Sequence, residues 1–259
     1  MKVRLRIFGL TALVLGVTII SCKKTISYPG NVLTNYYIPL QVGKYITYRM
    51  DSLNFYFYGQ NDTITSYLAK DSVEQKTVDG TGATVWLVTR YLSDTTGSFW
   101  SPSLTYVVSP SSAAIDVTED NLRFVKLGFP MDQGFSWTGN TYLPYNPYQD
   151  LFSYSDYLNL TLSDWNYVYT EVNQPFTVAN GMTFDSATTI LQIADSTNVP
   201  ITNPNAFASN TYWSETYAKH IGMIYRYTVM WEYQPPTPDG SQQGFKIGFA
   251  LRMSIVDHN

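Results

Sequence analysis

Acidic side chains are the residues of this sequence best suited to catalysis, because they gather in two places. One group is Asp116, Glu119 and Asp120, and the other is Asp150, Asp156 and Asp164, which flank an aromatic segment. Glycoside hydrolysis requires two carboxyl groups placed on either side of the bond that is cleaved. Acidic residues in turns are more often simply solvated, however. A carboxylate-dependent, glycan-cleaving enzyme is therefore an alternative hypothesis and not the first one.

The two histidines, His220 and His258, give little support for other kinds of catalysis. The sequence contains no G-x-S-x-G nucleophile elbow and no H-E-x-x-H zinc motif. Its acidic turns also lack the EF-hand pattern for calcium. We therefore expect no catalytic residue, no metal ion and no cofactor, and the first hypothesis is a protein that is not an enzyme.

A run rich in tyrosine and proline over residues 139–157 is the best candidate for a binding surface. Pro144 and Pro147 disfavour a helix at its start. Tyrosine rings in such a loop can stack on sugars, line an apolar groove or anchor a partner protein, or they can fold back over a sheet and become buried. The candidate ligand-binding residues are Tyr142, Tyr145, Tyr148, Tyr154 and Tyr157.

Strands are the elements expected to position these residues. Aromatic residues make up 16% of the chain and charged residues only 14%, a composition that favours pleated, half-buried surfaces. Strand-like runs occur at 44–50, 84–91 and 183–194, the last two after the turn signals Asp79-Gly80-Thr81-Gly82 and Asn180-Gly181. The sequence predicts an all-β, mainly antiparallel fold: a single curved sheet, a half-barrel or a sandwich, with little helix.

The clearest strand signals lie near the C-terminus. Alternation places Met223, Tyr225, Tyr227, Val229 and Trp231 on one face of the segment 222–232. It places Phe245, Ile247, Phe249, Leu251, Met253 and Ile255 on one face of the segment 245–255. The proline-rich stretch between the two segments cannot continue a strand ladder. We therefore expect two long strands that form an antiparallel pair.

The N-terminus has the features of an export signal. Basic residues (Lys2, Arg4 and Arg6) precede the apolar run 7–20, which is too short to span a membrane comfortably, and Ser21-Cys22 follows it. This arrangement resembles the lipobox of bacterial lipoproteins. The resemblance implies that Cys22 becomes the first residue of the mature chain and carries acyl chains, palmitate included, which anchor the protein in a membrane.

These observations divide the chain into a lipoprotein signal peptide (1–21), a lipidated N-terminus and tether (22–35) and a single antiparallel β domain (36–259). The residue after the cysteine is Lys23 instead of aspartate. By resemblance to lipoprotein sorting, this implies the outer membrane. No acidic tract follows, which favours its periplasmic face over the cell surface. The formal net charge of −4 argues against nucleic acid as a partner.

Two short motifs resemble a group of envelope lipoproteins of Gram-negative bacteria that have no assigned activity. The first is Pro39-Leu40-Gln41-Val42-Gly43-Lys44-Tyr45, and the second is Tyr217-Ala218-Lys219-His220-Ile221-Gly222-Met223-Ile224. The resemblance implies a mainly antiparallel β fold and no catalytic residue. His220 stands where this group commonly has glycine, so we expect a positive φ at this position.

The first functional hypothesis is a membrane-anchored envelope lipoprotein with a non-catalytic binding or structural role. In this hypothesis the tyrosine-rich run contacts a glycan or an envelope protein. The second hypothesis is a carrier of an apolar ligand or lipid inside a curved sheet. The third is the glycan-cleaving enzyme described above.

Overall fold

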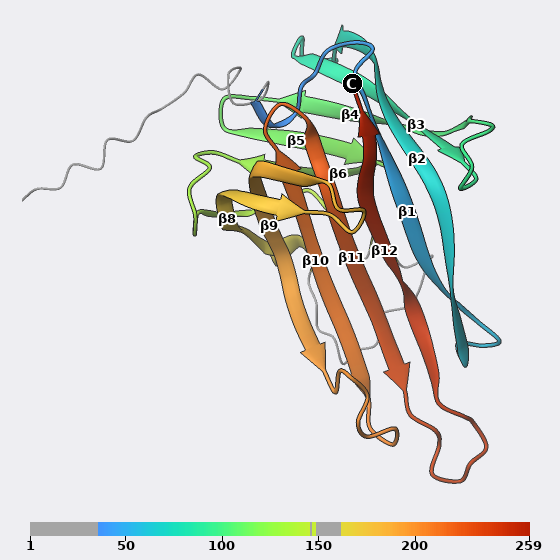
Figure 1. The fold of residues 1–259 in the computed structure, drawn as a ribbon. Helices are drawn as coiled ribbons and strands as arrows, with labels where there is room; N and C mark the ends of the chain where they lie inside the picture. The colour runs from blue at the N-terminus through green and yellow to red at the C-terminus, as the bar shows by residue number, and fades with distance from the viewer. Residues whose placement is uncertain (1–35, 146, 149–161) are drawn as a thin grey trace, which may run out of the picture.

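The chain folds into a 12-stranded antiparallel sheet in the computed structural model, which describes residues 36–145, 147–148 and 162–259 (Figure 1). The strands are β1 (Tyr45–Tyr56), β2 (Asn61–Val78), β3 (Thr84–Ser93), β4 (Ser101–Pro110), β5 (Ala114–Glu119), β6 (Leu122–Gly128), β7 (Ser136–Thr138), β8 (Asn166–Thr177), β9 (Thr183–Thr197), β10 (Ala208–Ala218), β11 (Gly222–Gln234) and β12 (Phe245–His258). A 3₁₀ helix, η1, spans Leu162–Asp164. In the described part of the chain, no helix has the length and apolar character needed to cross a membrane.

The sheet order is β6-β5-β4-β3-β2-β1-β12-β11-β10-β9-β8-β7, so the pairing of β1 with β12 joins the two halves of the chain. The sheet curves until its two outer strands approach each other. The amide of Val125 on β6 donates to the carbonyl of Gly139, just after β7, at 2.8 Å, and Trp137 Nε1 donates to the Val125 carbonyl at 2.7 Å. The result is a nearly closed, barrel-like sheet, which confirms the predicted all-β antiparallel class.

The predicted C-terminal pair is present, with β11 and β12 antiparallel and joined through the proline-rich stretch. Both predicted turns are also present. Asp79 Oδ1 accepts hydrogen bonds from the amides of Thr81 and Ala83 between β2 and β3. Gly181 has a φ of +87° between β8 and β9.

The register of β11 decides which of its side chains face the interior. Arg226 pairs with Met253 and Thr228 with Leu251, so these residues lie on the same face of the sheet. That face of β12 is the predicted apolar one, and it lines the interior together with Arg226 and Thr228. Tyr225 and Tyr227, from the face predicted on β11, therefore lie on the opposite, outer face. A register irregularity next to Tyr225 turns Met223, which was predicted on the same face, towards the interior.

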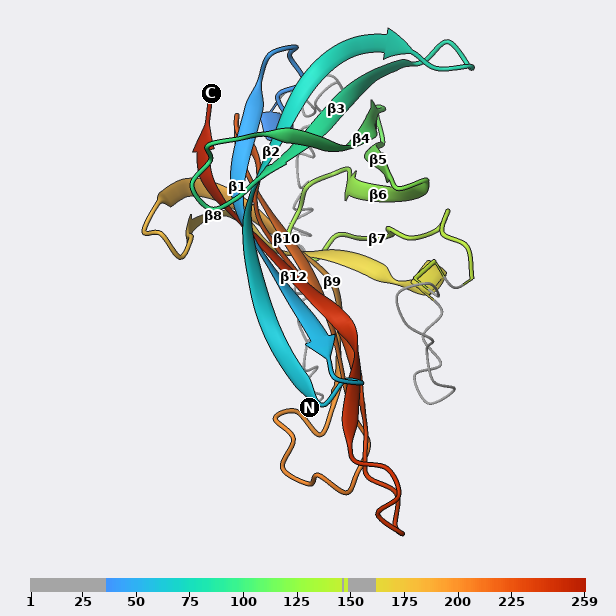
Figure 2. The same cartoon turned by 90° about the vertical axis from the view of Figure 1, so that its right-hand side faces the viewer.

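The molecule has two distinct ends (Figures 1 and 2). The described chain begins at the same end as the C-terminus, where the His220 amide donates to the Tyr36 carbonyl at 2.6 Å. His220 has a φ of +63°, which confirms the positive φ predicted for it. The connections β1–β2, β9–β10 and β11–β12 lie together at the other end.

Candidate functional site

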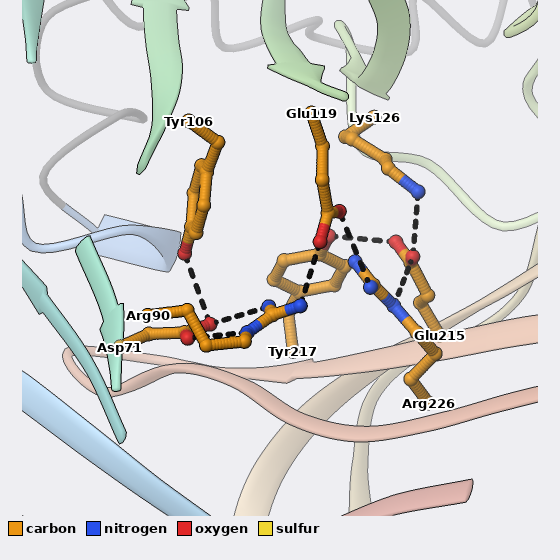
Figure 3. A network of polar contacts seen from close by, with 8 residues as sticks. All are labelled: Asp71, Arg90, Tyr106, Glu119, Lys126, Glu215, Tyr217 and Arg226. Atoms are coloured by element: carbon orange, nitrogen blue, oxygen red, sulfur yellow. Dashed lines mark hydrogen bonds and ion pairs between the residues drawn. The ribbon is translucent and has the colours of Figure 1, made fainter. Parts of the chain in front are cut away.

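Six ionisable side chains meet inside the curved sheet, each from a different strand (Figure 3). They form three cations and three anions joined by ion pairs, namely Asp71 (β2), Arg90 (β3), Glu119 (β5), Lys126 (β6), Glu215 (β10) and Arg226 (β11). Charged groups inside a fold need partners of opposite charge, because burial removes their hydration. The equal number of each sign satisfies this requirement.

One half of the network is organised by Arg90. Its Nε and Nη2 atoms donate to the two carboxylate oxygens of Asp71 at 2.7 and 2.8 Å, a bidentate geometry. Its Nη1 atom donates to Glu119 Oε1 at 2.6 Å. The Tyr106 hydroxyl on β4 donates to Asp71 Oδ2 at 3.0 Å. Arg90 thus links β2, β3 and β5 on the inner surface of the sheet.

The other half is organised by Glu215, which is 1% exposed. Its Oε1 atom accepts from Lys126 Nζ at 2.7 Å and from Arg226 Nε at 2.9 Å, and its Oε2 atom accepts from the Tyr217 hydroxyl at 2.8 Å. Arg226 Nη1 also lies 3.5 Å from Glu119 Oε2 and so connects the two halves.

These contacts join strands that are far apart in the sheet. Lys126 on β6 reaches Glu215 on β10, and Glu119 on β5 reaches Arg226 on β11. In the sheet order, β5 and β6 are separated from β10 and β11 by β4, β3, β2, β1 and β12. The network therefore crosses the interior and ties opposite walls of the curved sheet together.

The positive charges of the network hold Glu119 and Glu215 ionised. Burial alone would raise the pKa of Glu119, but the positive charges of Arg90, Arg226 and Lys126 outweigh this and lower that pKa to about 2. Burial opposes ionisation of Glu215 in the same way, and Lys126 and Arg226 bring its pKa to about 2. Burial lowers the pKa of Lys126, an effect that Glu215 partly offsets. Both glutamates are thus anionic at neutral pH.

Two cavities flank the network. The first, of about 90 Å³, is lined by apolar side chains such as Ile46, Val88 and Met223 as well as by the charged groups. The second, of about 160 Å³, is bordered by aromatic rings, including Trp213 and Phe249. Glu119, Lys126 and Arg226 line both cavities. The interior thus offers apolar surface on both sides of a polar partition, which suits an amphiphilic molecule.

The tyrosines predicted to bind a ligand lie in different surroundings. Tyr142 and Tyr145 are 54% and 86% exposed, and Arg123 lies over the Tyr142 ring at 4.0 Å. Tyr148 instead points into the second cavity, and its ring centroid lies 5.7 Å from those of Trp213 and Phe249. The remaining candidates, Tyr154, Tyr157 and the predicted lipidation site Cys22, lie outside the described residues. Contact through the tyrosine-rich run stays a prediction.

The predicted acidic candidates also lie in different surroundings, except that Glu119 and Asp120 both line the second cavity. Glu119 belongs to the network, whereas Asp116 forms an ion pair with Arg123, whose side chain is 49% exposed. Asp120 borders the second cavity, Asp164 lies in η1, and Asp150 and Asp156 fall outside the described residues.

A glycosidase needs one carboxyl group that holds its proton near neutral pH. The lowered pKa values of Glu119 and Glu215 give the opposite state. Within the described ranges, no group of three or more His, Cys, Asp or Glu residues could hold a metal ion.

Sequence reasoning did not identify most of the network, in particular Asp71, Arg90, Lys126 and Arg226. A usable signal was present. Arg90 follows the apolar run 85–88 closely, Lys126 stands inside Phe124-Val125-Lys126-Leu127, and Arg226 interrupts the run 223–231. A cation inside a buried strand requires an anion nearby, so such positions predict interior ion pairs.

Comparisons with known proteins add little to this description. No model of a known protein family matches the chain. No curated protein matches it in sequence. Among solved structures, one similar chain is a protein of Bacteroides fragilis, described as inferred to be exported and as having a YmcC-like fold. It is 11% identical, the match covers 86% of this chain and 99% of that one, and the TM-score is 0.36.

Proposed function

We propose that this protein is a non-catalytic binding protein of the bacterial cell envelope, anchored by a lipid on Cys22, and that it binds a small amphiphilic ligand inside its curved sheet. The observation that carries the proposal is the pair of cavities on the two sides of the ion network. The sequence supports two separate hypotheses: that the tyrosine-rich run contacts a glycan, and that the protein carries an apolar ligand. The geometry favours the carrier.

The lining of the second cavity supports this proposal. Phe124, Tyr148, Trp213 and Phe249 supply aromatic surface, and an apolar chain gains about 25 cal/mol for each Å² that it buries there. The charged floor, formed by Glu119, Lys126 and Arg226, would face the polar part of the ligand. Tyr148, one of the predicted ligand-binding residues, lines the second cavity, which supports the proposal.

A substitution that fills the second cavity is expected to weaken binding without unfolding the protein. Thr228, which is 8% exposed, lines this cavity next to Phe249 and Leu251. Thr228→Phe should lower the affinity for a fluorescent fatty-acid analogue roughly tenfold or more, equivalent to about 1.4 kcal/mol. Fluorescence titration measures the affinity, and circular dichroism checks the fold.

Phe99→Ala is the matched control, because it removes a ring that is 76% exposed and lines neither cavity, and it should leave the affinity unchanged. Native mass spectrometry of protein purified from its own membrane should also show a bound small molecule. A protein that carries no ligand and does not bind the fluorescent analogue would contradict the proposal.

The lipid anchor has a direct test. Cys22→Ser should abolish incorporation of radiolabelled palmitate and leave the unprocessed precursor, because serine lacks the thiol that forms the thioether to the lipid. Autoradiography measures the incorporation of palmitate, and gel mobility distinguishes the precursor from the mature protein. Cys22 is the only cysteine of the chain, so the wild-type label has one acceptor thiol. A Cys22→Ser protein that still matures and labels normally would disprove the anchor.

A further inference from the structure

Exposed aromatic side chains gather at the end of the molecule opposite the C-terminus. The last residue of β1, Tyr56, and the first two of the β1–β2 connection, Phe57 and Tyr58, are 43%, 68% and 95% exposed. The rings of Tyr56 and Phe57 contact each other, with centroids 5.0 Å apart. Adjacent aromatic rings of this exposure are unusual on a surface that has no ligand to cover them.

The backbone conformation of this connection is energetically unfavourable for aromatic residues. The Gln60 amide donates to the Phe57 carbonyl at 3.3 Å and closes a turn with Tyr58 and Gly59 at its centre. Phe57 and Tyr58 have φ values of +50° and +55°, and Gly59 has +76°. Turns with two positive φ values at their centre prefer Asn-Gly, and a bulky aromatic residue is strained there. Folding alone therefore does not explain why aromatic residues occupy these positions.

The surrounding connections hold this turn in place. The Lys246 amide donates to the Gly59 carbonyl at 2.7 Å, and the Tyr233 hydroxyl donates to the Pro204 carbonyl at 2.9 Å. A Cβ atom at Gly59 would collide with the Lys246 backbone, and one at Gly244 would collide with the Tyr233 ring. The β1–β2, β9–β10 and β11–β12 connections are thus packed closely into one preorganised unit.

A polar cavity of about 240 Å³ lies beside the aromatic rings. Its lining includes Gln60, Asn61, Asp62 and Lys246 next to Tyr56 and Tyr233. Asp62 and Lys246 are a loose ion pair at 3.8 Å, so the cavity carries both signs of charge. Amide groups both donate to and accept from hydroxyl groups, and carboxylate groups accept from them.

We propose that this end of the molecule binds an uncharged glycan chain. The apolar faces of the sugar rings would stack on Tyr56, Phe57 and Tyr58, and their hydroxyl groups would enter the polar cavity. Phospholipid is a poorer match, because the single lysine is already opposite Asp62 and the cavity is polar. The site is separate from the interior cavities, so this inference does not depend on the ligand proposed for them.

The test uses the purified protein in affinity gel electrophoresis, with dextran, yeast mannan or laminarin cast into the gel. At least one of these neutral polysaccharides should retard the wild-type protein. The double variant Phe57→Asn and Tyr58→Asn should lose at least 90% of the retardation, while its melting temperature stays equal or rises, because asparagine tolerates positive φ. Phe99→Ala, which removes a ring that is 76% exposed in the β3–β4 connection, should be retarded like the wild type.

Three outcomes would overturn the inference. The wild-type protein could migrate unchanged in all three gels. The double variant could be retarded as strongly as the wild type. Finally, vesicle sedimentation can be measured for the wild type and the double variant, both without residues 1–22. If the wild type sediments with phosphatidylcholine vesicles and the double variant does not, the turn is a contact for a membrane surface.

Discussion

Replacing Glu215 with glutamine is expected to lower the free energy of unfolding by about 3–5 kcal/mol, the usual cost of removing one partner from a buried ion pair. Glu215 is 1% exposed and is the shared acceptor of Lys126 and Arg226. Glutamine has nearly the same shape, so the loss comes from charge and not from a cavity. Urea denaturation at pH 7 measures the effect, and for a chain of this size the melting temperature should fall by about 10 °C.

Two controls separate the network from ordinary surface pairs. Arg123→Gln breaks the Asp116 pair, in which the arginine side chain is 49% exposed, and should cost less than about 1 kcal/mol. Lys126→Met together with Glu215→Gln removes a cation and an anion at once. This double variant should be more stable than Glu215→Gln alone, because fewer uncompensated charges remain in the interior. A cost below 1 kcal/mol for Glu215→Gln would show that the network does not hold the walls together.

The fold class was predictable from the sequence because five of the twelve strands, β1, β3, β9, β11 and β12, have a strong local signature. The segments 222–232 and 245–255 alternate and are separated by prolines, and β11 and β12 form there with the expected antiparallel pairing. Local patterns of this kind depend only on neighbouring residues. The positive φ of His220 was instead predicted from the glycine that the resembling lipoproteins commonly have at this position.

The interior charges were harder to predict because they depend on register. Along β11 both faces carry large side chains, so alternation alone does not tell which face is inside. A shift by one residue exchanges the two faces. The structure places Arg226 inside because its partners come from strands distant in the sequence: Glu119 from β5 and Glu215 from β10. A single sequence does not show which strands will meet across an interior.

The turn with Tyr58 and Gly59 at its centre shows a different limit of prediction from the sequence. The sequence Phe55-Tyr56-Phe57-Tyr58 reads as a continuation of strand β1, and only the backbone angles show that Phe57 and Tyr58 leave it. The tyrosine-rich run at 139–157 is a candidate binding surface only because of its composition. The strained, exposed pair at 57–58 carries the stronger argument for contact, because its residue types run against the local backbone preference.

The acid dependence of stability provides the second large effect. Glu119 and Glu215 have pKa values of about 2 in the folded protein, against an ordinary value of 4.5. Each group therefore contributes stability that is fully present above about pH 4.5 and is lost as the pH falls towards 2, because the unfolded chain takes up the proton first. The contribution of each is on the order of 3 kcal/mol. The two are not additive, since both depend on Arg226.

The free energy of unfolding, measured by urea denaturation between pH 7 and pH 3, should thus fall steeply below about pH 4.5. Exposed carboxylates with lowered pKa values, such as Asp79 and Asp94, contribute to the same decline. The difference between wild type and Glu215→Gln isolates the network. This difference should be largest at pH 7 and shrink as the pH falls, because a protonated glutamate resembles glutamine. A difference that stays constant down to pH 3 would mean that Glu215 stabilises the fold by its shape and hydrogen bonds instead of by its charge.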